Sequence, residues 1–187
     1  MQKPVKVLTQ SAMMLALATL LSVFAVFHLP NGGSVTLGSM IPLLFVAYKF
    51  DWPWSLLVAL AYSLIQMMSG FYAPPTQDLP SFVAVILLDY VLAFGVIGLG
   101  GVLFKNLQKH MKDHSAMLLS GLVTFAGRFF CHFLSGILIW SVYAPEGQPV
   151  WLYSAIYNGS YMGMEALISG IFLWFAGPRL LQKFKEM

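Results

Sequence analysis

Long apolar runs alternate with short polar connections along the whole sequence. At 1.5 Å of rise per residue, a helix of about 20 apolar residues crosses the hydrocarbon core of a bilayer. The runs therefore predict six membrane-spanning helices with short connections. These helices are expected at residues 7–27, 35–48, 55–70, 81–104, 116–141 and 152–176, the second being shorter and interrupted early by Pro42.

Composition places the chain in the same class. Hydrophobic residues make up 59% of the 187 residues and charged residues only 9%, whereas a soluble domain carries about 25% charged residues. We therefore expect an all-α integral membrane protein. Six spans use nearly the whole length, so residues 1–187 are expected to form one domain without a soluble catalytic domain. The single Cys131 rules out an intramolecular disulfide.

The first apolar run admits two interpretations. It follows Lys3 and Lys6, as the apolar core of a signal peptide follows basic residues. Its length and the lack of a small-residue cleavage site favour a retained first helix. Ala12 and Ala16 lie four residues apart on it, so one helix face allows close approach of another helix. This face either packs within the bundle or docks a partner protein.

Lysine and arginine residues lie almost entirely on one side of the predicted membrane. Apart from Arg128, they occur at the two termini, at Lys49 and in the connection after Phe104. Cytoplasmic connections are rich in these residues, so both termini are expected in the cytoplasm. The net charge of +3 then reflects topology and gives no sign of nucleic-acid binding. The connections without Lys or Arg, expected outside, are residues 28–34, 71–80 and 142–151.

Several polar side chains interrupt the apolar runs in the outer half of the predicted bundle. Counted inward from the outer helix ends, Asn158 lies ~9 Å deep, Asp89 ~12 Å and His132 ~13 Å. Trp140 and Tyr153 lie near the mouth. An ionisable residue within the bilayer is a functional-site candidate by default. Because a carboxylate among aromatic rings suits a flat organic cation, this layer predicts a binding site.

Each of these residues also has a structural interpretation. An intramembrane His or Asn often joins two helices by a hydrogen bond, and Trp and Tyr at helix ends form an aromatic belt. Tyr153 carries a further alternative, because it lies ~140° around the helix from Asn158. If the helix is regular there, Tyr157 is the first substitute to consider.

Two opposite charges lie deeper in the predicted bundle. Arg128 and Glu165 are both ~19 Å from the outer ends of consecutive antiparallel helices. Because a buried charge mostly requires an opposite charge nearby, we predict that they form a structural ion pair. A role as a relay or gate is the alternative.

Signatures of catalysis are missing from the sequence. It contains no GxxxxGKS/T loop, no HExxH and no Cys/His set with metal-ligand spacing. We therefore expect no enzyme, no bound metal and no cofactor in this chain. An intramembrane hydrolase using Asp89, His132 or Ser135 is the distant alternative, although no nucleophile, base and orienting group are clearly arranged.

Four blocks of sequence occur in the order seen in a known family. They are PNGGSV at 30–35, LLDYVLAF at 87–94, RFFCHFLSG at 128–136, and YAP, PVWLYS and YN between 143 and 158. Over nearly its whole length the chain resembles the thiamine-specific S components of energy-coupling factor (ECF) transporters, the ThiT/YuaJ family. The resemblance implies a six-helix protein of the bacterial cell membrane that binds thiamine from outside. It also implies a transmembrane coupling subunit and two cytoplasmic ATPase subunits, which use the ATP, as partners.

The resemblance also implies roles for single residues. By position, the thiamine ligands of the family fall on Asp89, Tyr90, His132, Trp140, Tyr153 and Asn158, and its AxxxA docking motif falls on Ala12 and Ala16. Some members have Glu in place of Asp89, and some have a Trp in the first outer loop, where Gly32 and Gly33 stand here. We therefore expect a lid aromatic, if there is one, to be Phe71 or Tyr72.

These observations predict a substrate-capture subunit for thiamine. The near alternative is an S component for a related vitamin or for an aminopyrimidine precursor of thiamine. The distant alternative is the intramembrane enzyme described above.

Overall fold

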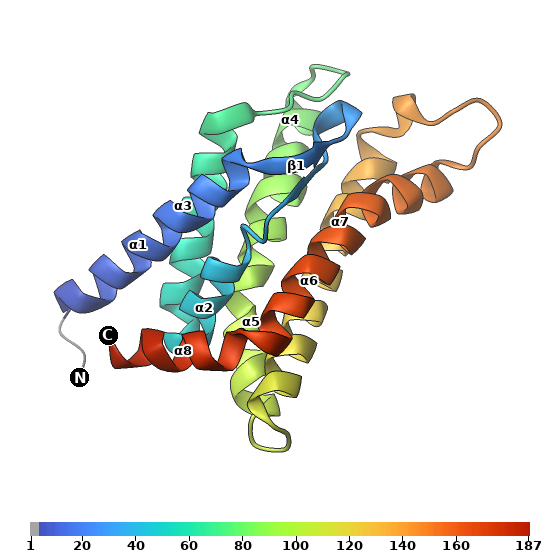
Figure 1. Cartoon of the computed structure of the whole chain (residues 1–187). Helices are drawn as coiled ribbons and strands as arrows, with labels where there is room; N and C mark the ends of the chain where they lie inside the picture. The colour runs from blue at the N-terminus through green and yellow to red at the C-terminus, as the bar shows by residue number, and fades with distance from the viewer. Residues whose placement is uncertain (1–3) are drawn as a thin grey trace.

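The computed structural model describes residues 4–187, which form a helical bundle with one short β-hairpin (Figure 1). Lys3, part of the basic N-terminal segment, lies outside the described residues. In chain order the elements are α1 (Pro4–Val23), β1 (Ala25–His28), η1 (Pro30–Gly32), β2 (Ser34–Thr36), α2 (Ile41–Lys49), α3 (Trp52–Gly70), α4 (Leu79–Val85), η2 (Ile86–Leu92), α5 (Ala93–Leu107), α6 (Asp113–Leu138), η3 (Ser141–Tyr143), α7 (Val150–Phe175) and α8 (Gly177–Glu186).

The all-α fold class is confirmed, but the predicted number of six spanning helices is not. Within residues 4–187, α1, α6 and the continuous helix Leu79–Leu107 are long and apolar enough to cross a membrane. α7 and α8 add a fourth span if they are counted together, although they meet at a bend of 68°. In the region of the second predicted span, 35–48, the one helix is α2, whose nine residues are about 14 Å long and too short to cross.

The first predicted span also ends earlier than the apolar run suggests. α1 stops at Val23, and the next residues form β1, which pairs antiparallel with β2. Gly32 makes the tight connection possible, because its φ of 103° favours glycine. A short apolar run is compatible with either a strand or a helix, so the hydrophobic pattern alone does not predict this hairpin.

The buried helix α2 lies at the centre of the bundle. Eight of its nine residues are buried, from Ile41 to Tyr48. Glycines of α5 allow close approach to both α2 and α3. A Cβ on Gly101 would overlap the carbonyl group of Ala47 in α2, and one on Gly98 would lie 2.6 Å from Leu56 Cα in α3. Such small-residue contacts let helix backbones meet in a membrane protein.

Both termini lie at the same end of the bundle (Figure 1). α8 runs across this end, where the ammonium group of Lys49 donates a hydrogen bond to the carbonyl of Phe184 and lies 4.2 Å from its ring. The hairpin and the connections before α4 and α7 gather at the opposite end (Figure 1). This arrangement agrees with two termini on one side, while the cytoplasmic location of that side stays a prediction.

The contact between α5 and α2 gives a first testable prediction. Gly101→Ala should lower the free energy of unfolding by about 1–3 kcal/mol, because the added methyl group forces the two backbones apart. The measurement is the midpoint of thermal unfolding of the purified protein in detergent.

Gly163→Ala in α7 is the matched control. A Cβ on Gly163 meets nothing within 4 Å, so this variant should unfold at the same temperature as the parent or slightly above it. An equal loss in both variants would show that helical glycines matter here for a reason other than close packing.

Candidate functional site

A turn of π-helix interrupts the long helix Leu79–Leu107. It covers η2, Ile86–Leu92, and carries Asp89 and Tyr90. Single turns of π-helix are frequent at functional sites, because they change the direction of the side chains around them. Residues 86–92 contain neither Gly nor Pro, so no residue there signals an irregular turn of helix.

The carboxylate of Asp89 receives hydrogen bonds from three side chains. His132 Nδ1 lies 2.9 Å from Oδ1, and Ser135 Oγ donates to Oδ2 at 2.6 Å. Trp140 Nε1 donates to Oδ2 at 3.2 Å and to Ser135 Oγ at 3.1 Å. An ionised carboxylate only accepts hydrogen bonds, so His132 Nδ1 is the donor of this contact when Asp89 is ionised. The predicted meeting of Asp89, His132 and Trp140 is therefore present, with Ser135 as a member to which no binding role had been given.

Asn158 joins α6 to α7 beside this cluster. Its Nδ2 donates to the carbonyl of His132 at 3.2 Å and to that of Ser154 at 3.0 Å. Its Oδ1 accepts from the hydroxyl of Tyr161 at 2.9 Å. The structural interpretation of Asn158 as a link between helices is thus present, and its role in binding stays a prediction.

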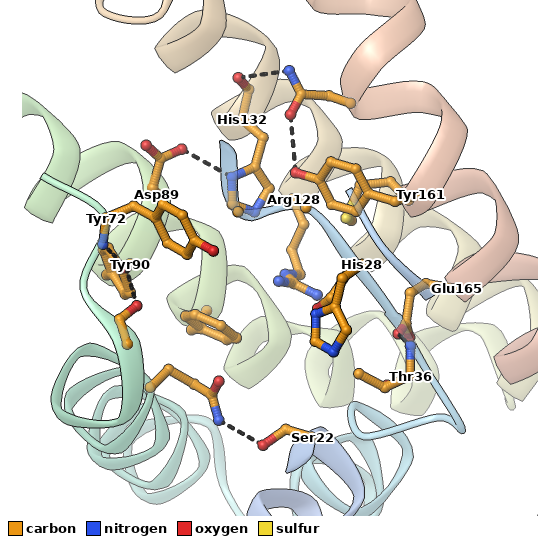
Figure 2. A pocket seen from close by; sticks show the side chains of 18 of the residues that line it. Ser22, His28, Thr36, Tyr72, Asp89, Tyr90, Arg128, His132, Tyr161 and Glu165 are labelled. Carbon is orange, nitrogen blue, oxygen red and sulfur yellow. Dashed lines mark hydrogen bonds and ion pairs between the residues drawn. The ribbon is translucent and has the colours of Figure 1, made fainter. Parts of the chain in front are cut away.

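All six predicted ligand residues line one cavity of about 470 Å³. Figure 2 shows part of this lining, including Asp89, Tyr90 and His132. This volume falls within the range of small-molecule sites. The walls come from α3, the helix Leu79–Leu107, α6, α7 and the hairpin. Tyr153 and Tyr157 both line the cavity, with ring centres 5.8 Å apart, so the choice left open between them is not exclusive.

Tyr72 closes one side of the cavity. A Cβ on Gly32 would lie 2.9 Å from the Tyr72 ring, so the hairpin and the connection after α3 touch at this glycine. The hydroxyl of Tyr90 accepts from the Tyr72 amide and donates to the carbonyl of Gly70, both at 3.3 Å. Phe71 instead stacks between Phe82 and Tyr90. Of the two predicted lid residues, Tyr72 is the one that lines the cavity.

Two side chains of α7 hold the hairpin. The hydroxyl of Tyr157 donates to the carbonyl of Pro30 and accepts from the amide of Gly33 at 3.3 Å. The carboxylate of Glu165 accepts a hydrogen bond from the amide of Thr36 at the end of β2. Both ends of the connection through η1 and β2 are therefore tied to α7.

The predicted ion pair between Arg128 and Glu165 is not formed. Among the described residues, no hydrogen bond or ion pair joins the two side chains, although both are buried and line the cavity (Figure 2). The Arg128 guanidinium lies 4.7 Å from the centre of the Phe94 ring, and Glu165 binds Thr36. The apolar run at 35–48 predicts a helix, in which the amide of Thr36 would not be expected to bind the Glu165 carboxylate.

Sequence reasoning assigned no role to three further polar residues that line the cavity. Gln66 Nε2 donates to Ser22 Oγ at 3.0 Å, and His28 comes from β1. Gln66 interrupts an apolar run, so the rule applied to Asp89 would have found it. In the part of the chain that the structure describes, no three His, Cys, Asp or Glu side chains are grouped to hold a metal ion.

A bundle of apolar helices, with a cavity lined by aromatic residues and by a hairpin at one end, is the arrangement expected of a solute-binding component of a membrane transporter. The profile of the family described as "Thiamine transporter protein (Thia_YuaJ)" matches residues 8–185. The chain therefore belongs to this family of thiamine transporters. It is a multi-pass membrane protein with a role in transport, and it is not an enzyme.

Individual relatives agree with this assignment. The chain is 32% identical to the thiamine transporter ThiT of Bacillus subtilis over 191 residues, which cover 95% of each protein. It is 39% identical to ThiT of Lacticaseibacillus paracasei over 80 residues, or 39% of each protein. A solved ThiT structure from Listeria monocytogenes superimposes with a TM-score of 0.72 at 24% identity, covering 94% of this chain and 96% of the other, and shows the same fold.

The two bonds of the Tyr90 hydroxyl give a second prediction. Tyr90→Phe should leave the fold intact but release the connection that carries Tyr72, because a neutral hydrogen bond contributes about 0.5–1.5 kcal/mol. Amide hydrogen exchange of residues 71–78 should become about two- to tenfold faster in the variant.

Tyr143→Phe is the control for this experiment. Tyr143 also lines the cavity and stacks on Trp140, but it is not bonded to the connection after α3. Exchange in residues 71–78 should therefore stay at the parent rate. Unchanged exchange in Tyr90→Phe would mean that Tyr72 is positioned by packing alone.

Proposed function

We propose that this chain is the substrate-binding S component of an ECF importer and captures thiamine from outside the bacterial cell. A coupling subunit and two ATPase subunits then drive uptake, with ATP hydrolysis confined to these partners. Family membership and the names of the relatives support thiamine transport. The observation that carries the proposal is the carboxylate of Asp89, held by three donors at the wall of an aromatic cavity.

The charges around the cavity favour a monocation. The lining residues include two carboxylates, Asp89 and Glu165, and one guanidinium, Arg128. With neutral histidines, their formal charges of −2 and +1 sum to −1. Thiamine carries one permanent positive charge on its thiazolium ring, so binding neutralises the cavity. Two charges of opposite sign attract strongly in a site from which water is excluded.

The aromatic residues of the cavity suit the two flat rings of thiamine. The bond from Trp140 Nε1 to Asp89 fixes the plane of the indole ring, and the Tyr143 ring stacks on it at 6.2 Å. A fixed aromatic face offers cation–π attraction to a thiazolium and stacking to a pyrimidine. An ionised carboxylate has about four acceptor positions, so Asp89 keeps capacity for the pyrimidine amine beside its three donors.

The third prediction tests the charge of Asp89. Asp89→Asn should weaken thiamine binding by about 1.5–3 kcal/mol, or ten- to a hundredfold, through loss of a charge-assisted contact. Trp140→Ala should weaken it by about 1–2 kcal/mol through lost cation–π attraction and stacking. Both affinities are measured by tryptophan-fluorescence quenching of the purified protein. Pyrithiamine, which keeps the cation, and a neutral thiazole analogue separate the two roles of Asp89, since an equal loss for both assigns the carboxylate to the pyrimidine.

Asp78→Asn is the control with the same change of charge. Asp78 is the exposed N-cap of α4, outside the cavity, and hydrogen bonds from Thr76 and Ser81 lower its pKa, so it is ionised at neutral pH. This variant should bind thiamine like the parent. If neither Asp89→Asn nor Trp140→Ala changes the affinity, the thiamine site lies elsewhere. A free aminopyrimidine that binds more tightly than thiamine would make the precursor the substrate.

The fourth prediction concerns the coupling subunit. Ala12 and Ala16 line a shallow apolar groove of about 520 Å³ between α1 and Ile65 of α3. Ala12→Leu or Ala16→Leu should abolish thiamine uptake in cells that supply the coupling module, because the larger side chain fills the groove and keeps a partner helix away. Thiamine binding by the isolated protein should not change.

Leu17→Phe adds bulk to another face of the same helix. Leu17 lies ~140° around α1 from Ala12, is exposed and does not line the groove, so uptake should be normal. Full uptake by both leucine variants would place the docking face elsewhere on the protein.

A further inference from the structure

Three buried polar atoms in the deep part of the cavity have no hydrogen-bond partner among the described residues. They are Arg128 Nε, Glu165 Oε2 and the hydroxyl oxygen of Tyr62, and all three residues line the same cavity. Buried polar groups are almost always paired, so unpaired ones in a native fold require an explanation. Arg128 and Glu165 are 6% and 4% exposed and carry opposite charges, and leaving two such buried groups without a direct ion pair is costly.

The partner that Glu165 has instead belongs to the hairpin. Its Oε1 accepts from the amide of Thr36, the last residue of β2. Thr36 is buried, and its hydroxyl is bonded to Ser39 at the start of the connection to α2. Glu165 therefore holds the hairpin at the point where it enters the bundle, and both Glu165 and Thr36 line the cavity (Figure 2).

We propose that Glu165 is a positioning residue that holds the hairpin over the cavity, and that Arg128 is its competing partner when the hairpin lifts. The proposal rests on the proposed function in one respect, that the hairpin covers the thiamine site. Arg128 is the one Lys or Arg residue among those lining the cavity of the described chain. When Thr36 withdraws its amide, the carboxylate would lose a donor in a buried place, and pairing with Arg128 replaces it.

This exchange of partners lowers the energy difference between two arrangements of the hairpin, because the Glu165 carboxylate keeps a hydrogen-bond donor in both. In the closed arrangement Glu165 binds a backbone amide and Arg128 keeps its contact with the Phe94 ring. In the open arrangement the two charges satisfy one another. Because the Glu165 carboxylate has a partner in both arrangements, opening the hairpin costs less than it would if the buried charge were left alone. A two-state element of this kind suits a site that must both capture and release its ligand.

Tyr157 supplies a tether without charge. Its hydroxyl binds Pro30 and Gly33 at the tip of the hairpin. Tyr157→Phe therefore loosens the hairpin without affecting the charge balance, and serves as the control for a tether that has no competing partner.

The test measures hairpin opening and thiamine kinetics separately. Spin labels on Val26→Cys and Trp151→Cys, both at exposed positions, report the distance between the hairpin and the outer end of α7 in nanodiscs. The buried Cys131 is first replaced by Ser. Stopped-flow tryptophan fluorescence gives the association and dissociation rates of thiamine. Glu165→Ala should shift the label distances toward a longer population and raise the dissociation rate about ten- to a hundredfold.

We call the hydrogen bond that Glu165 accepts from the Thr36 amide the latch. Two further variants separate this latch from the competing pairing of Glu165 with Arg128. Glu165→Gln keeps an oxygen for the Thr36 amide but loses the charge that would pair with Arg128, so without ligand the label distances should shift toward the shorter population. Arg128→Met should shift the label distances in the same direction, because it removes the competing partner. The label distances of the double variant should match those of either single one, since the two residues act as a pair.

The outcomes decide between the latch and a purely structural role. Unchanged label distances in Glu165→Ala, or additive effects of Glu165→Gln and Arg128→Met, would overturn the proposal. If Glu165→Ala does not fold, the double variant without either charge still measures the coupling. The label distances need no ligand, so a protein that fails to bind thiamine would refute the proposed function and leave the test of the latch intact. Tyr157→Phe should raise the dissociation rate without slowing association.

Discussion

The hydrogen-bonded carboxylate of Asp89 is the interaction on which the site depends. It lies on a π-helical turn and draws His132 and Ser135 of α6, and Trp140 just after that helix, to one side of the cavity. A buried charge without partners would cost several kcal/mol. The same three donors that make Asp89 tolerable also fix the imidazole and indole rings. Stability and binding geometry therefore come from one set of contacts.

The cavity exists because several elements are unusually short or closely packed. α2 is too short to span and leaves room above it for the hairpin, while glycines bring α5 against α2 and α3. The hairpin contributes backbone amides where a helix would offer none, since helical amides are already paired. One of these amides, that of Thr36, satisfies Glu165. Irregular backbone within a membrane protein is tolerated where it lines a cavity in this way.

Sequence periodicity foresaw the helices that carry the site but not the elements that complete it. Counting residues along a helix placed Asp89, His132 and Asn158 in one layer, because the rise of a helix is constant. The π-turn at Asp89 and the strand at Thr36 break that regularity without a Gly or Pro signal at 86–92. Equal depth therefore predicted a contact between Arg128 and Glu165, whereas contact also depends on which groups lie between them. Long-range pairing of this kind is not encoded in local pattern.

The charges inside the cavity connect capture with release. A cavity with a net charge of −1 attracts a monocation. Strong attraction alone would make dissociation slow, whereas a carrier must also release its ligand. A wall that can exchange a backbone amide for a buried guanidinium changes the shape of the site without creating an unpaired charge. Because Glu165 lies on α7, whose N-terminal half also carries Tyr157 and Asn158, a movement of this one helix would alter the hairpin and the cavity wall together. Coupling of that kind requires no second ligand site, because the hairpin contacts and the cavity wall share one helix.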